Sequence, residues 1–167
     1  KTPSQRQTLL FSATYPQEIQ AIAERVMAAP VMARVTSTHD KVTIEQHFYA
    51  VEGKEHRRKG LISLLNHFRP DSALVFCNTR RETQAVADML VDRGFSALAL
   101  HGELEQRDRD TTLVQFANKS LSILVATDVA ARGLDIESID AVINYEIAHD
   151  PEIHLHRIGR TGRAGST

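Results

Sequence analysis

The sequence predicts an α/β fold built on a parallel sheet, and three observations carry that prediction. Short apolar runs such as Ala73–Cys77 and Ser122–Ala126 recur along the chain from about residue 44. Stretches with helical periodicity separate them, for example Arg57–Phe68, whose leucines fall on one face. The apolar runs lack the polar alternation of half-exposed strands, so we expect strands covered on both faces by helices.

The elements expected after residue 43 alternate in type. Strands are expected over Ile44–Val51, Ala73–Cys77, Ser96–Leu100, Ser122–Ala126 and Ala141–Tyr145, and helices over Arg57–Phe68, Glu82–Val91, Glu105–Phe116 and Asp150–Arg157. Gly94 follows the second of these helices at the position where a left-handed residue commonly ends a helix. Pro151 falls in the first turn of the last helix, where its missing N–H costs nothing.

The first 40 residues predict a strand over Gln7–Ala13, a helix over Gln17–Met27 and an extended tract over Pro30–His39. We expect residues 1–30 to be the last strand and helix of one domain, 31–43 a linker, and 44–167 a second domain truncated before its last strand. Because Thr8–Ser12 would then lack its own sheet, it is a candidate for pairing with another copy of the chain.

Composition limits the classes of function. The 167 residues are 42% hydrophobic and 25% charged, with a net charge of −1, so attraction to nucleic acid would have to come from local clusters. The single cysteine, Cys77, lies in an apolar run and cannot form a disulfide within the chain, which favours a reducing, cytoplasmic setting. No apolar run reaches the roughly 18 residues that suggest a membrane span, so no membrane partner is expected.

Polar residues follow three of the predicted strands. Asn78 and Thr79 come after the first buried run, Gly102 after the next, and Thr127 and Asp128 after the third. Ligands of open parallel sheets bind beyond these carboxyl ends, and small donors near helix starts suit phosphate groups. The alternative is that these residues only cap the helices that follow, and the sequence leaves both interpretations open.

Two further clusters carry charge. Gln106 and Arg109 share a helix face within an alternating run of acids and bases, which is equally typical of a solvated helix start. Arg157, Arg160 and Arg163 recur every third residue in a stretch without an acid. That stretch suggests cations directed at a polyanion, although a solvated basic surface would have the same composition.

Two absences narrow the possibilities. The chain has no G-x-x-x-x-G-K-[ST] phosphate loop. The histidines at 154 and 156 lie near no ligand pattern with metal spacing, so no metal site is expected. Arginines at the sheet edge without a phosphate loop suggest one half of a composite site whose other half holds a triphosphate.

The chain resembles the DEAD-box ATP-dependent RNA helicases over nearly its whole length. The stretches that carry the resemblance are Ser12-Ala-Thr14, Leu74-Val-Phe-Cys-Asn-Thr79, Gln106-x-x-Arg109, Ala126-Thr-Asp-Val-Ala-Ala-Arg-Gly-Leu-Asp135 and His156-Arg-Ile-Gly-Arg-Thr-Gly-Arg163. The resemblance implies a second RecA-like domain preceded by a remnant of the first. The stretch Leu100–Asp110 is most similar to the bacterial DbpA-like subgroup.

The resemblance also implies residue roles. Arg160 and Arg163 would be arginine fingers for ATP held by the first domain, which would also hold most of the Mg²⁺ coordination. Gly133 and Asp135 would contact the nucleotide, and Arg157 would be a structural or cleft-bridging contact. RNA would lie against Asn78, Thr79, Gly102, Arg109, Thr127 and Asp128, while Ser12, Thr14, Gln106, Arg132 and His156 would couple the two domains.

The implied activity is unwinding of short or structured RNA duplexes, with ribosomal RNA and ribosome biogenesis as one setting. ATP and RNA would close the cleft between the two RecA-like domains, and hydrolysis would reopen it. The isolated chain is expected to be inactive. A non-catalytic RNA-binding module and a DNA-translocating helicase remain as alternatives.

Overall fold

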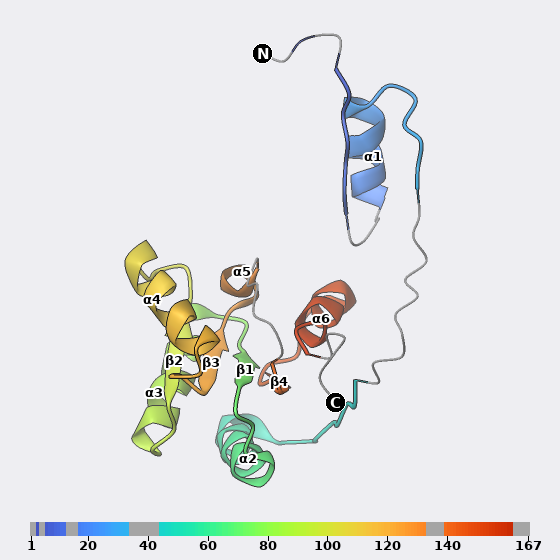
Figure 1. Ribbon diagram of the computed structural model, residues 1–167. Coiled ribbons are helices and arrows are strands. Elements are labelled where there is room, and N and C mark those ends of the chain that lie inside the picture. The colour runs from blue at the N-terminus through green and yellow to red at the C-terminus, as the bar shows by residue number, and fades with distance from the viewer. Residues whose placement is uncertain (1–2, 4–5, 13–16, 34–43, 133–138, 162–167) are drawn as a thin grey trace. The chain divides into compact units, whose positions relative to one another are not determined.

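The computed structural model describes residues 3, 6–12, 17–33, 44–132 and 139–161 (Figure 1). The chain divides into two compact units, residues 1–39 and 40–167. In the first unit, helix α1 (Gln17–Val26) confirms the predicted helix and buries Ala23. The predicted strand over Gln7–Ala13 is not formed in its described part, residues 7–12, and Phe11 there is 87% exposed.

A parallel sheet of four strands forms the centre of the second unit. Its strands are β1 (Ala73–Phe76), β2 (Ala97–Leu100), β3 (Ile123–Ala126) and β4 (Ala141–Asn144), in the order β2-β3-β1-β4. Phe76 pairs with both Ala126 and Asn144, and Leu100 also pairs with Ala126. The four strands therefore end level with one another, which brings the residues that follow them to one edge.

Helices cover both faces of this sheet, as predicted. Helices α2 (Gly53–Phe68) and α3 (Arg80–Asp92) pack on one face, where Ala73 and Val75 of β1 point. Helices α4 (Gln106–Ala117) and α5 (Asp128–Ala131) cover the other, where Leu74 and Phe76 point. All four β1 residues are buried, so β1 is a central strand enclosed by two apolar layers.

The helix ends follow the local sequence signals. Gly94 has a φ of +83° just after α3, the left-handed conformation that glycine adopts without strain. Pro151 begins α6 (Pro151–Ile158), whose N-cap Asp150 accepts a hydrogen bond from the Glu152 N–H at 2.7 Å. Both signals placed the helix boundaries to within two residues.

One predicted strand of the second unit is wrong. Residues 44–51 are extended but form no ladder with any described strand, and Phe48 is 84% exposed. Composition rich in β-branched and aromatic residues produces a strand only where a neighbouring edge supplies hydrogen-bond partners. The short helix α5 was not predicted, because four residues are too few for a periodic pattern.

Candidate functional site

The level strand ends gather the polar residues that the sequence singled out. Asn78 and Thr79 follow β1, Gly102 lies two residues after β2, and Thr127 and Asp128 follow β3. The Thr79 hydroxyl accepts from the Glu82 N–H at 3.2 Å at the start of α3. Thr127 caps α5 in the same way, so the capping interpretation holds for both threonines. Their contact with phosphate stays a prediction, since a capping hydroxyl still has a proton to donate.

Arg157 of α6 is the centre of the site. Its side chain is 1% exposed, and its guanidinium lies 4.9 Å from the ring centroid of Phe76. Nε and Nη2 donate to the two carboxylate oxygens of Asp128 at 2.7 and 2.8 Å. This bidentate geometry is the form of ion pair that best compensates a buried charge and its partly buried partner.

The remaining donors of Arg157 reach the ends of β1 and β4. Nη2 donates to Asn78 Oδ1 at 2.8 Å, and Nη1 donates to Asn144 Oδ1 at 3.1 Å and to the Glu146 carbonyl at 2.6 Å. One guanidinium thus joins α6 to three of the four strand ends. This is the structural role expected for Arg157, and it removes that arginine from the group of cations available to a polyanion.

The side-chain amide of Asn78 is largely occupied by hydrogen bonds within the protein. Its amide nitrogen donates to the Ile147 carbonyl at 3.0 Å and lies 3.4 Å from His149 Nε2, while its oxygen accepts from Arg157. Asp128 is likewise occupied by the Arg157 guanidinium. Direct RNA contact by these two side chains remains a prediction, and in this structure they orient the loops that carry them.

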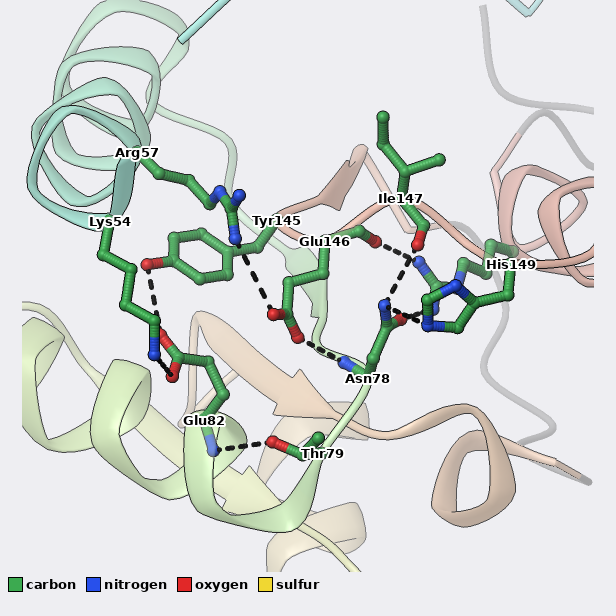
Figure 2. A network of polar contacts seen from close by, with 10 residues as sticks. Lys54, Arg57, Asn78, Thr79, Glu82, Tyr145, Glu146, Ile147 and His149 are labelled. Carbon is green, nitrogen blue, oxygen red and sulfur yellow. Dashed lines mark hydrogen bonds and ion pairs between the residues drawn. The ribbon is translucent and has the colours of Figure 1, made fainter. Parts of the chain in front are cut away.

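A second layer of polar contacts lies between the sheet and the starts of α2 and α3. Figure 2 shows the Glu146 carboxylate reaching between Arg57 and the backbone of Asn78. Beside it, the Tyr145 hydroxyl donates to Glu82 at 3.4 Å, and Lys54 pairs with the same carboxylate at 3.4 Å. Burial, with the nearby Glu82 charge, raises the pKa of Tyr145 above its ordinary value. The phenol therefore acts as a donor here.

Cys77, directly after β1, is fully buried next to this layer. Burial, with the nearby carboxylates of Glu146 and Glu82, raises the pKa of the Cys77 thiol to about 12. A thiol that stays protonated is a poor nucleophile, so Cys77 is a packing residue.

A polar hollow of about 540 Å³ opens at the ends of β1 and β2. Its lining residues are Thr79, Arg80, Arg81, Gln84, His101 and Glu103. Arg80 forms an ion pair with Glu103 across it, and His101, which is buried, lies with Nε2 3.1 Å from Gln84 Oε1. The hollow combines guanidinium groups with a capping threonine, a set of donors suited to a phosphate backbone.

Gln106 and Arg109 lie in the first turn of α4, as predicted. The Gln106 amide donates to Asp110 at 2.7 Å and is exposed. Arg109 is half-buried, and its Nε atom has no hydrogen-bond partner among the described residues. Gly102, close by in sequence, is exposed, with no atom within 4 Å of the position that a β-carbon would occupy. A backbone could approach closely at that point.

The other predicted residues are placed as follows. Arg160 is half-buried just beyond α6, and its N–H donates to the Arg157 carbonyl at 3.2 Å. His156 and Arg132 are exposed at α6 and at the end of α5, and Ser12 is exposed in the first unit. Thr14, Gly133, Asp135 and Arg163 lie outside the described residues. Among the described residues, no cluster of histidine, cysteine or carboxylate side chains could hold a metal ion, and no helix is long and apolar enough to cross a membrane.

Asn144 and Glu146 were missed by the reasoning from sequence. Asn144 is the last residue of β4, and Glu146 follows β4 as Asn78 follows β1, so the same rule about strand ends would have found them. Polar residues were singled out only at the ends of the first three buried runs, so the end of β4 was not considered.

Comparison with known proteins agrees with this arrangement. The family model described as helicase conserved C-terminal domain matches residues 56–165. The chain is 56% identical to the ATP-dependent RNA helicase DbpA of Escherichia coli and 43% identical to the ATP-dependent rRNA helicase rrp3 of Emericella nidulans. Each match covers 99% of this chain and 36% of the relative, so the chain spans about a third of their length.

Among solved structures, Saccharomyces cerevisiae Dbp5 bound to RNA and ADP BeF3 has a TM-score of 0.84 at 27% identity. That match covers 98% of this chain and 44% of Dbp5. The chain therefore belongs to the helicase conserved C-terminal domain family, in the RecA-like α/β form found in DEAD-box ATP-dependent RNA helicases.

Proposed function

We propose that this chain is the C-terminal half of the core of an ATP-dependent RNA helicase. It would contribute one side of an RNA-backbone site and one side of an ATP site, and closure onto a first domain would unwind a short duplex. The sequence itself contains no phosphate loop, so the isolated chain is expected not to hydrolyse ATP.

The buried guanidinium of Arg157 is the observation that carries this proposal. It joins Asn78 and Asp128, at the predicted RNA side, to the helix that leads into Arg160. RNA bound at the strand ends and a nucleotide near Arg160 would thus contact two regions that the Arg157 hydrogen bonds hold together. Such a connection can couple RNA binding to nucleotide binding, because a shift in one region displaces the other.

ATP supplies the phosphoryl group, and the residues of this chain would stabilise its charge. Arg160, and Arg163 beyond the described range, would approach the γ-phosphate as arginine fingers, since guanidinium groups match phosphate oxygens in a planar, bidentate way. Gly133 and Asp135 would contact the nucleotide, and Mg²⁺ would be held mainly by the first domain. His156, Arg132, Gln106, Ser12 and Thr14 would connect the two domains.

RNA would bind mainly through its sugar-phosphate backbone. The polar hollow beside Thr79, the exposed Gly102 and the half-buried Arg109 support this assignment. Backbone contacts position a strand without selecting its sequence. Because the rrp3 relative is an rRNA helicase, ribosomal RNA is the first candidate substrate to test, and we propose a cytoplasmic setting. For the first unit we propose self-association with another copy of the chain through the exposed apolar segment at Phe11.

Arg160→Ala tests the ATP half of the proposal. In the full-length protein we expect RNA-stimulated ATPase to fall by roughly 10³-fold or more, the usual contribution of an arginine finger, with RNA affinity retained. Steady-state ATPase and RNA binding by fluorescence anisotropy would be measured together. Arg93→Ala, at the exposed end of α3, is the matched control and should hydrolyse at the parental rate. Parental hydrolysis by Arg160→Ala would refute the assignment.

A further inference from the structure

We infer that Glu146 is a positioning residue for the arginine-bearing end of α6. The inference rests on the proposed function, and it concerns a residue that follows β4, outside every stretch that pointed to ATP or RNA. Glu146 contacts both partners that define the site, Asn78 and Arg157, and those partners contact each other.

The side chain of Glu146 fixes the end of β1. Its Oε2 atom accepts from the backbone N–H of Asn78 at 2.7 Å, across 68 residues of sequence (Figure 2). The side chain is 21% exposed, so this is a largely desolvated, charge-assisted hydrogen bond. Asn78 lies two residues beyond the end of β1, and Glu146 accepts from its N–H.

The backbone of Glu146 fixes Arg157 and the register of β4. Its carbonyl accepts from Arg157 Nη1 at 2.6 Å, and its N–H donates to the Phe76 carbonyl at 3.2 Å. Arg157 Nη2 donates in turn to Asn78 Oδ1 at 2.8 Å. Glu146, Asn78 and Arg157 therefore form a closed ring of three hydrogen bonds, in which moving one member displaces the other two.

The contact with α2 is of a different kind. Arg57 Nη1 lies 3.7 Å from Glu146 Oε1, too far for a strong hydrogen bond, and about a third of the Arg57 side chain is exposed. Partly exposed ion pairs contribute little to stability. The acceptor oxygen facing Asn78, rather than the charge facing Arg57, is therefore the part of Glu146 that positions the site.

The ring is linked to Arg160 through the turn that follows α6. Arg160 lies three residues after Arg157, and its N–H donates to the Arg157 carbonyl at 3.2 Å. A displacement of Arg157 is thus passed directly to the residue proposed to reach ATP. Misplacement of a reacting group by about 1 Å can cost on the order of 100-fold in rate.

Two substitutions in the full-length protein separate the role of Glu146 as a hydrogen-bond acceptor from the role of its charge. Glu146→Ala removes the acceptor for the Asn78 N–H, whereas Glu146→Gln keeps a carbonyl oxygen there and loses only the charge. We expect Glu146→Ala to lower the kcat of RNA-stimulated ATPase by about tenfold or more, with KM for ATP unchanged. Glu146→Gln should retain most of the parental kcat. Glu55→Ala, which breaks an ion pair with Arg58 within α2, is the matched control and should not change kcat.

The thermal unfolding of each variant would be measured in parallel. The ATPase activity of Arg160→Ala would be measured alongside that of the Glu146 variants. A parental kcat for Glu146→Ala, or an equal loss in Glu146→Ala and Glu146→Gln, would overturn the inference. A kcat loss that only follows the fraction of unfolded protein would also overturn it. If Arg160→Ala is inactive while Glu146→Ala is not, only this inference fails. If Arg160→Ala hydrolyses ATP normally, the proposed function itself fails.

Discussion

Arg157 and Arg160 have the same chemistry and different surroundings. The guanidinium of Arg157 is buried and donates to Asp128, Asn78, Asn144 and the Glu146 carbonyl. Arg160 is half-buried beyond the end of α6. Spacing alone suggested one group of cations, because sequence shows charge but not how deeply each side chain is buried. Burial separates Arg157, which holds the strand ends together, from the half-buried Arg160.

The raised pKa of Cys77 makes a prediction about alkaline pH. The thiol has an ordinary pKa of 9.0 and titrates at about 12 in the folded protein, so above pH 9 the unfolded state binds fewer protons. The free energy of unfolding should therefore fall as pH rises from 9 towards 12, by at most about 1.4 kcal/mol per pH unit for one group. Urea unfolding of parental protein and Cys77→Ala would be compared across this range. Identical pH slopes would contradict the prediction.

At the scale of elements, all four strands of the sheet were predicted, including the edge strands β2 and β4, whereas residues 44–51 were wrongly predicted to be a strand. β1 and β3 were identified because both of their faces are apolar, and α3 because its periodicity, its cap and Gly94 agree. Residues 44–51 have comparable strand composition but lack a neighbouring edge in the described structure. Pairing partners are a tertiary property, so local sequence could not settle that segment. The rule about strand ends was used for the ends of β1, β2 and β3 but not for the end of β4, so Glu146 was missed.

The cap of α3 gives a prediction at this scale. Thr79→Ala removes the hydroxyl that accepts from the Glu82 N–H and should reduce the free energy of unfolding by about 1 kcal/mol, whereas Thr79→Ser should retain it. Thr111→Ala is the control, because that exposed hydroxyl bonds only to the Arg107 carbonyl within α4. Urea denaturation of the three variants is the measurement. Equal stability of Thr79→Ala and Thr79→Ser would show that the cap contributes nothing.

At the scale of the whole molecule, positive and negative charges nearly balance. Binding of a polyanion must therefore depend on local clusters of positive charge. With a net charge of −1, the chain offers no general attraction for a polyanion. The hollow at the ends of β1 and β2 instead places Arg80 and Arg81 beside Glu103. Affinity for RNA would depend on a few phosphate contacts, each of which releases counterions.

Arg109 is the residue on which to test how RNA affinity depends on phosphate contacts and salt concentration. Arg109→Ala should weaken RNA binding and reduce the slope of log Kd against log salt by about 1, the contribution of a single phosphate contact. Fluorescence anisotropy with a single-stranded RNA, over a series of salt concentrations, would give the slope. Arg93→Ala, exposed at the end of α3, should leave the slope unchanged. An unaltered slope in Arg109→Ala would exclude this residue from the RNA site.

The burial of Arg157 also bears on how relatives of this domain should be interpreted. A related protein that had lost ATP hydrolysis would still need an arginine at this position, because Asp128 would otherwise retain an uncompensated, partly buried charge. Under the proposed function, the same protein would no longer need Arg160 for contact with ATP. Arginine at position 157 is thus a marker of folding, whereas arginine at position 160, if it acts as proposed, would be the marker by which active and inactive descendants could be told apart.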